Sequence, residues 1–381
     1  MSAAASLVAG VTAVVCGATA AQADAAGAQA APAAPNAIGR TWASAIEGNG
    51  VIVGSSSERA VRWETDGRIT VLDGLYEPAG AYANEANESG VVVGDSDLEF
   101  TVNFHAVRWN ANGQITDLEP GVDNLSSATD VNASGDAVGW SWEYGALRWS
   151  LNGQRTVLPL LPGGVDGGAW GVNDDGQITG WSDADATGTR GRAVRWSPTG
   201  TVTPLDAVPG ETSSWGGDIN GSGTVVGTAT ISGRPKAVRW SPSGAATLLG
   251  TLPGHVEASP YRINDSGVAV GTSISATNTG TPVRWDANGT ITALPLLPGS
   301  SGGNAAGIND AGVIVGDANV NGVLHAVRWN LDGTVEDLGG LPPRSARAAT
   351  RSPSRANPCV TGARRHSPAT SGTCAEHAVR P

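Results

Sequence analysis

Two pairs of carboxylates are the first candidates for chemistry in this sequence. Asp95 and Asp97 form one pair, Asp183 and Asp185 form the other, and each follows a short apolar segment. Such carboxylates could work as a general acid and base on a polysaccharide, or their oxygens could bind Ca²⁺. Acidic residues in loops are more often simply solvated. We favour that interpretation for both pairs.

Other signs of catalysis or metal binding are weak. The chain has no H-E-x-x-H motif and no P-loop. His105 and His325 occupy the same position of a repeat, which argues against a histidine metal cluster with His255. The chain has 3 Cys, and they lie near its two ends, so a cysteine metal site or a disulfide scaffold is not expected. We therefore predict a protein that is not an enzyme, with no metal and no cofactor.

One internal repeat must supply the elements that position any site. The pair Arg-Trp recurs seven times, ending at residues 63, 109, 149, 196, 240, 285 and 329. A Gly-x-x-x-Gly segment keeps pace with it, from 50–54 to 312–316, and usually follows an apolar residue and Asn. Internal repeats of ~40–50 residues are typical of propellers and solenoids.

Each repeat contains four short strand patterns. In the seventh repeat they cover 305–309, 313–318, 325–330 and 334–339, and the turns between them end in Gly, which readily adopts positive φ. Four antiparallel strands in each of seven repeats predict an all-β, seven-bladed β-propeller over residues 40–342. A linear solenoid is the alternative, but it would need capping units.

The recurring A-V-R-W segment should pack the blades together. Alternate residues of a strand share a face, so Val and Trp should face one neighbouring blade, and Ala and Arg the other. Because Arg recurs in all seven repeats, we expect a structural role in which each guanidinium binds main-chain carbonyls or an acidic group between blades. A ring of arginines lining an anion channel is the alternative.

Aromatic residues that break the repeat are the best candidates for ligand binding. The chain has 13 Trp, and six of them lie outside the Arg-Trp pairs. Units three to five contain five of these six and one nearby tyrosine, namely Trp140, Trp142, Trp181, Trp170, Trp215 and Tyr144. Aromatic faces near a polar rim bind sugar rings or extended peptides. The alternative is that these residues pack between blades or fill the central funnel.

The net charge and the two ends of the chain indicate which partners and which localisation to expect. The net charge is −12, which disfavours nucleic acid and anionic membranes as partners. Residues 1–25 resemble a secretory signal peptide without its basic start, so we expect the true start to lie upstream. An Ala/Pro linker at 26–39 and a disordered basic tail at 343–381 should flank the ring. The final "HAVRP" at 377–381 is either a relic of an eighth unit or chance.

The order and spacing of "IN..G.VVG", "HAVRW" and "LPG" resemble the HAF repeat family of extracellular bacterial proteins over about 40–342. The Phe of the family's triplet is mostly Val here. The resemblance implies a secreted protein and provides no catalytic residues. We expect a monomeric, non-catalytic binding or scaffold module for an extracellular polysaccharide or a cell-surface protein. The alternatives are a polysaccharide hydrolase or lyase, and a degraded copy without a selected function.

Overall fold

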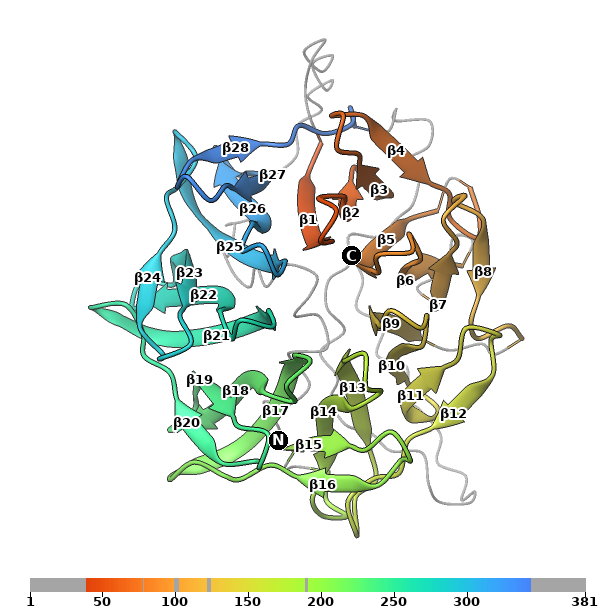
Figure 1. The fold of residues 1–381 in the computed structure, drawn as a ribbon, viewed down its shortest axis with the longest axis vertical. Helices are drawn as coiled ribbons and strands as arrows, with labels where there is room; N and C mark the ends of the chain where they lie inside the picture. Colours follow the sequence, from red (N-terminus) through yellow and green to blue (C-terminus); the bar gives the residue numbers. More distant parts are fainter. Residues whose placement is uncertain (1–38, 78, 99–102, 122–124, 189–190, 344–381) are drawn as a thin grey trace, which may run out of the picture.

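The computed structural model describes residues 39–343 except 78, 99–102, 122–124 and 189–190. It consists of seven four-stranded antiparallel sheets arranged in a ring, which confirms the predicted seven-bladed propeller (Figure 1). The signal-peptide and linker predictions for 1–25 and 26–39 lie outside the described residues except for Gly39, and so does the predicted tail except for Pro343. No helix within the described residues is long and apolar enough to cross a membrane.

The blades follow one another along the chain. Blade 1 consists of β1 (Thr41–Ile46), β2 (Ile52–Ser56), β3 (Arg59–Trp63) and β4 (Ile69–Leu72). Blade 2 consists of β5 (Ala81–Ala86), β6 (Val92–Asp97), β7 (Phe104–Trp109) and β8 (Ile115–Asp117). Blade 3 consists of β9 (Ser126–Val131), β10 (Ala137–Ser141), β11 (Gly145–Trp149) and β12 (Arg155–Val157). Blade 4 consists of β13 (Gly167–Val172), β14 (Ile178–Asp183), β15 (Gly191–Trp196) and β16 (Val202–Pro204).

The last three blades are built in the same way but are longer. Blade 5 consists of β17 (Glu211–Ile219), β18 (Val225–Ile231), β19 (Arg234–Trp240) and β20 (Ala246–Leu248). Blade 6 consists of β21 (His255–Ile263), β22 (Ala269–Ser275), β23 (Gly280–Trp285) and β24 (Ile291–Ala293). Blade 7 consists of β25 (Ser300–Ile308), β26 (Ile314–Val320), β27 (Val323–Trp329) and β28 (Val335–Asp337).

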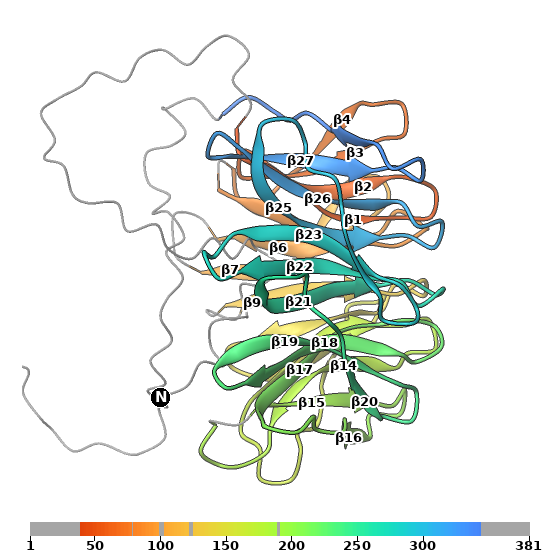
Figure 2. The same ribbon diagram turned by 90° about the vertical axis from the view of Figure 1, so that its left-hand side faces the viewer.

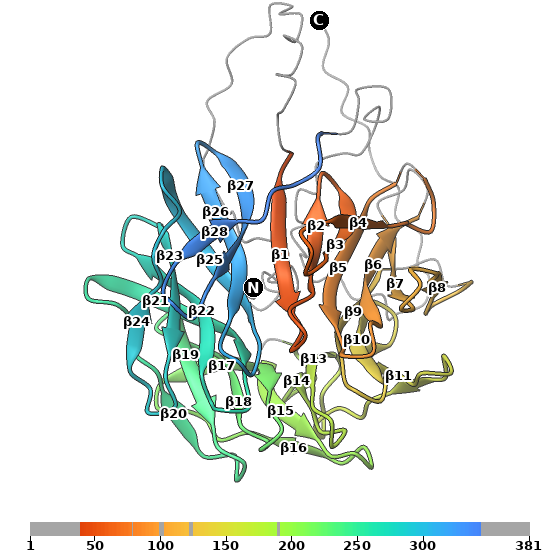
Figure 3. The ribbon, with the colours of Figure 1, turned by 45° about the horizontal axis from the view of Figure 1, so that its top comes forward.

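Within each blade the first strand lies nearest the ring axis and the fourth lies at the outer edge (Figure 1). Seen from the side, the blades stack face against face (Figure 2). β1 packs against β25, β26 and β27, so the chain closes on itself and the solenoid alternative is wrong (Figure 3). Main-chain and hydroxyl groups hold the closure: Gly39 N donates to the Leu341 carbonyl at 3.1 Å, and Leu341 N donates to Ser56 Oγ at 2.7 Å.

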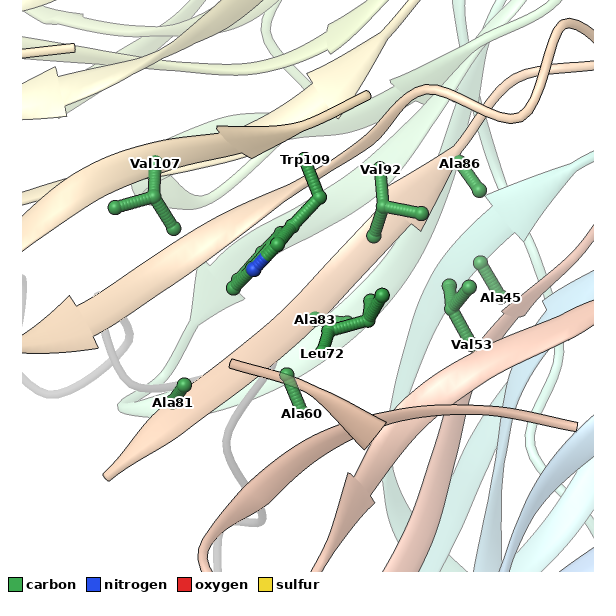
Figure 4. Packing of buried hydrophobic residues seen from close by; sticks show 10 residues of the cluster. All are labelled: Ala45, Val53, Ala60, Leu72, Ala81, Ala83, Ala86, Val92, Val107 and Trp109. Atoms are coloured by element: carbon green, nitrogen blue, oxygen red, sulfur yellow. The ribbon is translucent and has the colours of Figure 1, made fainter. Parts of the chain in front are cut away.

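Seven apolar clusters fill the seven interfaces, and each contains one Trp of the Arg-Trp pairs. In the interface of blades 1 and 2, Trp109 shares a cluster with Ala60 and Leu72 (Figure 4). Ala106, next to Val107 in β7, belongs instead to the interface with blade 3. The predicted division of A-V-R-W between two faces is therefore confirmed.

The indole N–H groups add a polar link across the same interfaces. Six of the seven donate to an oxygen of a residue that lies before their own blade in the chain. The six donors are the indoles of Trp109, Trp149, Trp196, Trp240, Trp285 and Trp329. Trp240 Nε1, for example, donates to the Asp206 carbonyl at 2.8 Å. Trp63 Nε1 has no hydrogen-bond partner within the described residues.

The recurring arginines lie on the third strands, away from the innermost strands. The anion-channel alternative is therefore wrong. Arg108, Arg195 and Arg239 donate to main-chain carbonyls of the next blade, as expected. Arg62 and Arg328 differ, because each pairs with a glutamate of its own blade.

The first strands of blades 5 to 7 differ from the prediction. The pattern in the seventh repeat placed that strand at 305–309, whereas β25 starts at Ser300. The extra residues are Ser, Gly and Asn, which have little strand propensity of their own. They are extended because β26 also continues to Val320 and pairs with them.

Candidate functional site

Five of the aromatic residues outside the Arg-Trp pairs share one level of the ring. The first and second strands of every blade are paired in the same register, which defines one equivalent residue pair per blade. These pairs are Trp42/Ser55, Tyr82/Asp95, Ser127/Trp140, Gly168/Trp181, Trp215/Thr228, Ser259/Thr272 and Asn304/Asp317. Five consecutive blades thus contribute one aromatic ring each, and we call Trp42, Tyr82, Trp140, Trp181 and Trp215 the aromatic belt.

Contacts hold the belt rings in place. Trp42 of blade 1 stacks on Tyr82 of blade 2, with ring centroids 6.0 Å apart and an interplanar angle of 12°. Trp140 meets the ring of Phe104 edge-on at 6.0 Å. Trp181 lies over Gly168, where an added Cβ would come within 2.9 Å of its Nε1. Tyr82 is buried and the four tryptophans are half-buried, so part of each indole reaches solvent.

The belt lies beside a step in one face of the ring. In blades 1 to 4 the belt position is the second residue of a six-residue first strand, as at Trp42 and Gly168. In blades 5 to 7 it is the fifth residue of a nine-residue strand, as at Trp215. Three more residues extend a strand by at most about 10 Å. The belt position therefore lies at the rim in blades 1 to 4 and below a wall in blades 5 to 7.

Charged side chains from four first strands meet near the axis, deeper in the ring than the belt. We call Glu85, Asp130, Asp218 and Arg262 the charged layer. The residue after the β-bulge of each first strand is Ala45, Glu85, Asp130, Gly171, Asp218, Arg262 or Gly307. Arg262 Nε of blade 6 donates to Glu85 Oε2 of blade 2 at 2.9 Å. Its Nη2 donates to the Thr129 carbonyl of blade 3 at 3.3 Å. Since these blades are not neighbours, the arginine spans the centre of the ring.

The electrostatics of this layer follow from burial. Burial raises the pKa values of Glu85, Asp130 and Asp218, and the charge of Arg262 opposes the rise. Burial alone would lower the pKa of Arg262, but the three carboxylates outweigh it and raise that pKa. Asp130 also accepts Val172 N at 2.7 Å from the next blade. The contacts of this layer therefore hold different blades together.

The structure separates the six predicted ligand residues. Trp140, Trp181 and Trp215 belong to the belt. Trp142, with 60% of its surface exposed, follows β10 in the adjoining turn. Tyr144 lies in the same turn, where the Arg155 guanidinium stacks 4.0 Å from its ring centroid. Trp170 is at the bulge of β13, deeper than the belt and next to the charged layer.

Sequence reasoning did not assign Trp42 and Tyr82 to the site, nor any residue of the charged layer. Trp42 and Tyr82 could be assigned to the site only from the register between neighbouring strands. The reason is that the aromatic residue lies on the first strand in some blades and on the second strand in others. For the charged layer, the signal was the residue before the apolar-Asn pair, where Glu85, Asp130, Asp218 and Arg262 replace small residues.

The interpretation of the carboxylate pairs as solvated loop acids is wrong for three residues, because only Asp185 lies outside a strand. Asp95 is buried within β6 and accepts Ser127 Oγ at 3.1 Å, and Asp183 is buried at the end of β14. Asp97 is also in β6 and accepts Gly80 N, whereas Asp185 lies in a turn as predicted. Blade 3 separates the two pairs. In the described part of the chain, no group of three or more His, Cys, Asp or Glu could hold a metal ion.

No family model matches the chain, and no curated protein matches it. Solved propellers do resemble its structure. Virginiamycin B lyase from Staphylococcus aureus is 15% identical, with a TM-score of 0.51, over 73% of this chain and 91% of that one. A puromycin hydrolase is 15% identical, with a TM-score of 0.55, over 79% of this chain and 53% of that one. Prolyl endopeptidases reach a TM-score of 0.56 at 11% identity, over 79% of this chain and 50% of theirs.

The chain thus spans about half the length of the puromycin hydrolase and of the prolyl endopeptidase. At these identities the likeness shows a shared β-propeller fold alone. The resemblance to the HAF repeat family stays a prediction.

Proposed function

We propose that this protein is a non-catalytic binding module that holds a polysaccharide against the aromatic belt. The observation that carries the proposal is the presence of one aromatic ring at the same level in each of five consecutive blades. Four of these rings are half-buried, so each is fixed by packing but still offers part of its surface. Rigid, partly exposed rings bind with a small loss of conformational entropy.

Blades 6 and 7 supply polar groups where the belt has no ring. Thr272 Oγ1 donates to Asn304 Oδ1 at 2.7 Å, and Asn304 Nδ2 donates to both oxygens of Asp317 at 3.1 Å. A pyranose has apolar ring faces and hydroxyl edges. A belt of five rings completed by a polar segment suits both features of such a ligand.

The sequence supports the localisation and the partners that we propose for the protein. The resemblance to the HAF repeat family and the signal-like segment 1–25 support secretion. We further propose that the protein is a monomer and that a cell-surface protein is the alternative ligand. The net charge of −12 supports partners other than nucleic acid or an anionic membrane.

A titration with soluble cell-wall and plant polysaccharides tests the site. We expect saturable quenching of tryptophan fluorescence in the full chain. The variant Trp140→Ala/Trp142→Ala/Trp181→Ala should bind at least about tenfold more weakly, since one lost stacking contact of ~1.4 kcal/mol is already tenfold. Tyr76→Ala, which removes an exposed ring outside the belt, should bind normally. Equal binding by the triple variant and the wild type would exclude Trp140, Trp142 and Trp181 as ligand contacts.

A polysaccharide hydrolase or lyase is the second candidate, and one observation favours it. Burial raises the pKa of Asp317 to about 6, which suits a general acid, although Asn304 opposes the rise. Release of shortened or unsaturated sugars that is lost in Asp317→Asn, while binding persists, would support this activity. Intact polysaccharide after long incubation would contradict it.

A further inference from the structure

A ladder of asparagine side chains bridges six of the seven seams between blades. The Asn that follows the apolar residue in each first-strand motif donates Nδ2 to the main-chain carbonyl at the same position of the next blade. The six donors are Asn87, Asn132, Asn173, Asn220, Asn264 and Asn309. The last of them donates to the Glu47 carbonyl of blade 1 at 3.1 Å, so the ladder also crosses the closure of the ring.

Blade 1 has glutamate at this position, and the seam between blades 1 and 2 therefore lacks the amide donor. Glu47 is only 6% exposed. Its Oε2 accepts Asn49 Nδ2 at 3.0 Å, whereas its Oε1 is buried and has no hydrogen-bond partner within the described residues. An ionised carboxylate can only accept hydrogen bonds. It cannot bridge to a carbonyl of blade 2, but a protonated carboxyl can.

The charged groups around Glu47 make the seam sensitive to its ionisation. Glu85 and Glu88 of blade 2 face it, together with Arg62 of blade 1, which is itself paired with Glu64 at 2.9 Å. Burial raises the pKa of Glu47 to about 7, the hydrogen bond from Asn49 opposes the rise, and Glu85 and Glu88 add to it. Glu88 Oε1 also accepts Gly48 N at 2.8 Å, which keeps a second carboxylate at the same seam.

We propose that the seam between blades 1 and 2 is a pH-dependent latch, closed when Glu47 is protonated and donates toward the main chain of blade 2, and weakened when Glu47 is ionised. The folded state holds this proton more tightly than the unfolded chain, whose Glu releases it near pH 4.5. The contribution to stability is therefore complete at low pH and is lost as pH rises toward 7. The Trp42–Tyr82 stack joins the same two blades, so the latch lies beneath one end of the belt.

The variants Glu47→Asn and Glu47→Gln test the latch in the full chain. Glu47→Asn installs the residue of the other six blades, and Glu47→Gln keeps the length of the side chain. At pH 8 we expect each variant to melt about 2–5 °C above the wild type, and at pH 5 to melt within about 1 °C of it. Amide exchange corrected for its intrinsic pH dependence should show faster opening at 47–51 and 87–91 in the wild type at pH 8 only.

A matched control moves the carboxylate to another seam. Asn220→Asp should make exchange across blades 5 and 6 depend on pH, while the seam of blades 1 and 2 keeps its wild-type behaviour. Glu85, Asp130, Asp218 and Asp317 are present in every variant, so differences from the wild type isolate Glu47. If both Glu47 variants melt at the wild-type temperature and show wild-type amide exchange at pH 8, the proposal is overturned. If Glu47→Asn misfolds, the same comparison with Glu47→Gln decides.

Discussion

Replacement of Arg262 by methionine should destabilise the ring by about 3–5 kcal/mol at pH 7, which is the usual cost of breaking a buried ion pair. The arginine side chain is mostly buried and joins blade 6 to Glu85 in blade 2 and Thr129 in blade 3. Without it, the carboxylates of Glu85, Asp130 and Asp218 share the layer without their cation. Urea denaturation of both proteins at pH 7 measures the loss.

Acid should restore part of this stability. Burial already raises the pKa values of the three carboxylates, and loss of the cation must raise them further. The variant should therefore regain stability as pH falls from 7 to 5, because its folded state takes up protons that the unfolded chain does not. Arg262→Met/Glu85→Gln is the control, and it should be more stable at pH 7 than the single variant. If Arg262→Met lowers the free energy of unfolding by less than about 1 kcal/mol, Arg262 contributes little to the stability of the ring.

Truncation of a tryptophan of the Arg-Trp pairs should have a similarly large effect. Trp240 is fully buried in the interface of blades 4 and 5. Trp240→Ala leaves a cavity and an unpaired Asp206 carbonyl, and large-to-small changes of this kind cost about 3–5 kcal/mol. Trp142→Ala, at an exposed turn, should change the free energy of unfolding by no more than about 0.5 kcal/mol. Equal effects of the two variants would contradict the packing role of the repeated tryptophan.

A second pair of variants separates the hydrogen bond from the packing. Trp240→Phe loses the bond from Nε1 to Asp206, whereas Trp63→Phe loses none that the described residues show. The phenylalanine at 240 should therefore cost about 1 kcal/mol more than the one at 63.

The sequence predicted the parts of the fold that depend on neighbouring residues. The second and third strands, the Gly turns and the number of blades follow from patterns repeated within each unit. The first strands of blades 5 to 7 were predicted too short, because residues such as Ser300 to Asn304 become a strand only by pairing with an extended partner.

The candidate site was predicted in part. Trp140 and Trp181 stand at the same place in adjacent repeats, so comparison of repeats finds them. Trp42 and Tyr82 occupy the first strand where those two occupy the second, and only the register between strands shows that all four lie at one level.

By itself, the sequence determined seven four-stranded units and the face on which each repeated tryptophan packs, because strand alternation and turn chemistry act over a few residues. Only the tertiary structure decided which residues meet at the centre. Glu85 and Arg262 are 177 positions apart and come together because the ring closes and brings blades 2 and 6 to its axis. The same closure places Glu47 at the one seam that has no asparagine bridge within the described residues, which is a property of the whole ring and of no single repeat.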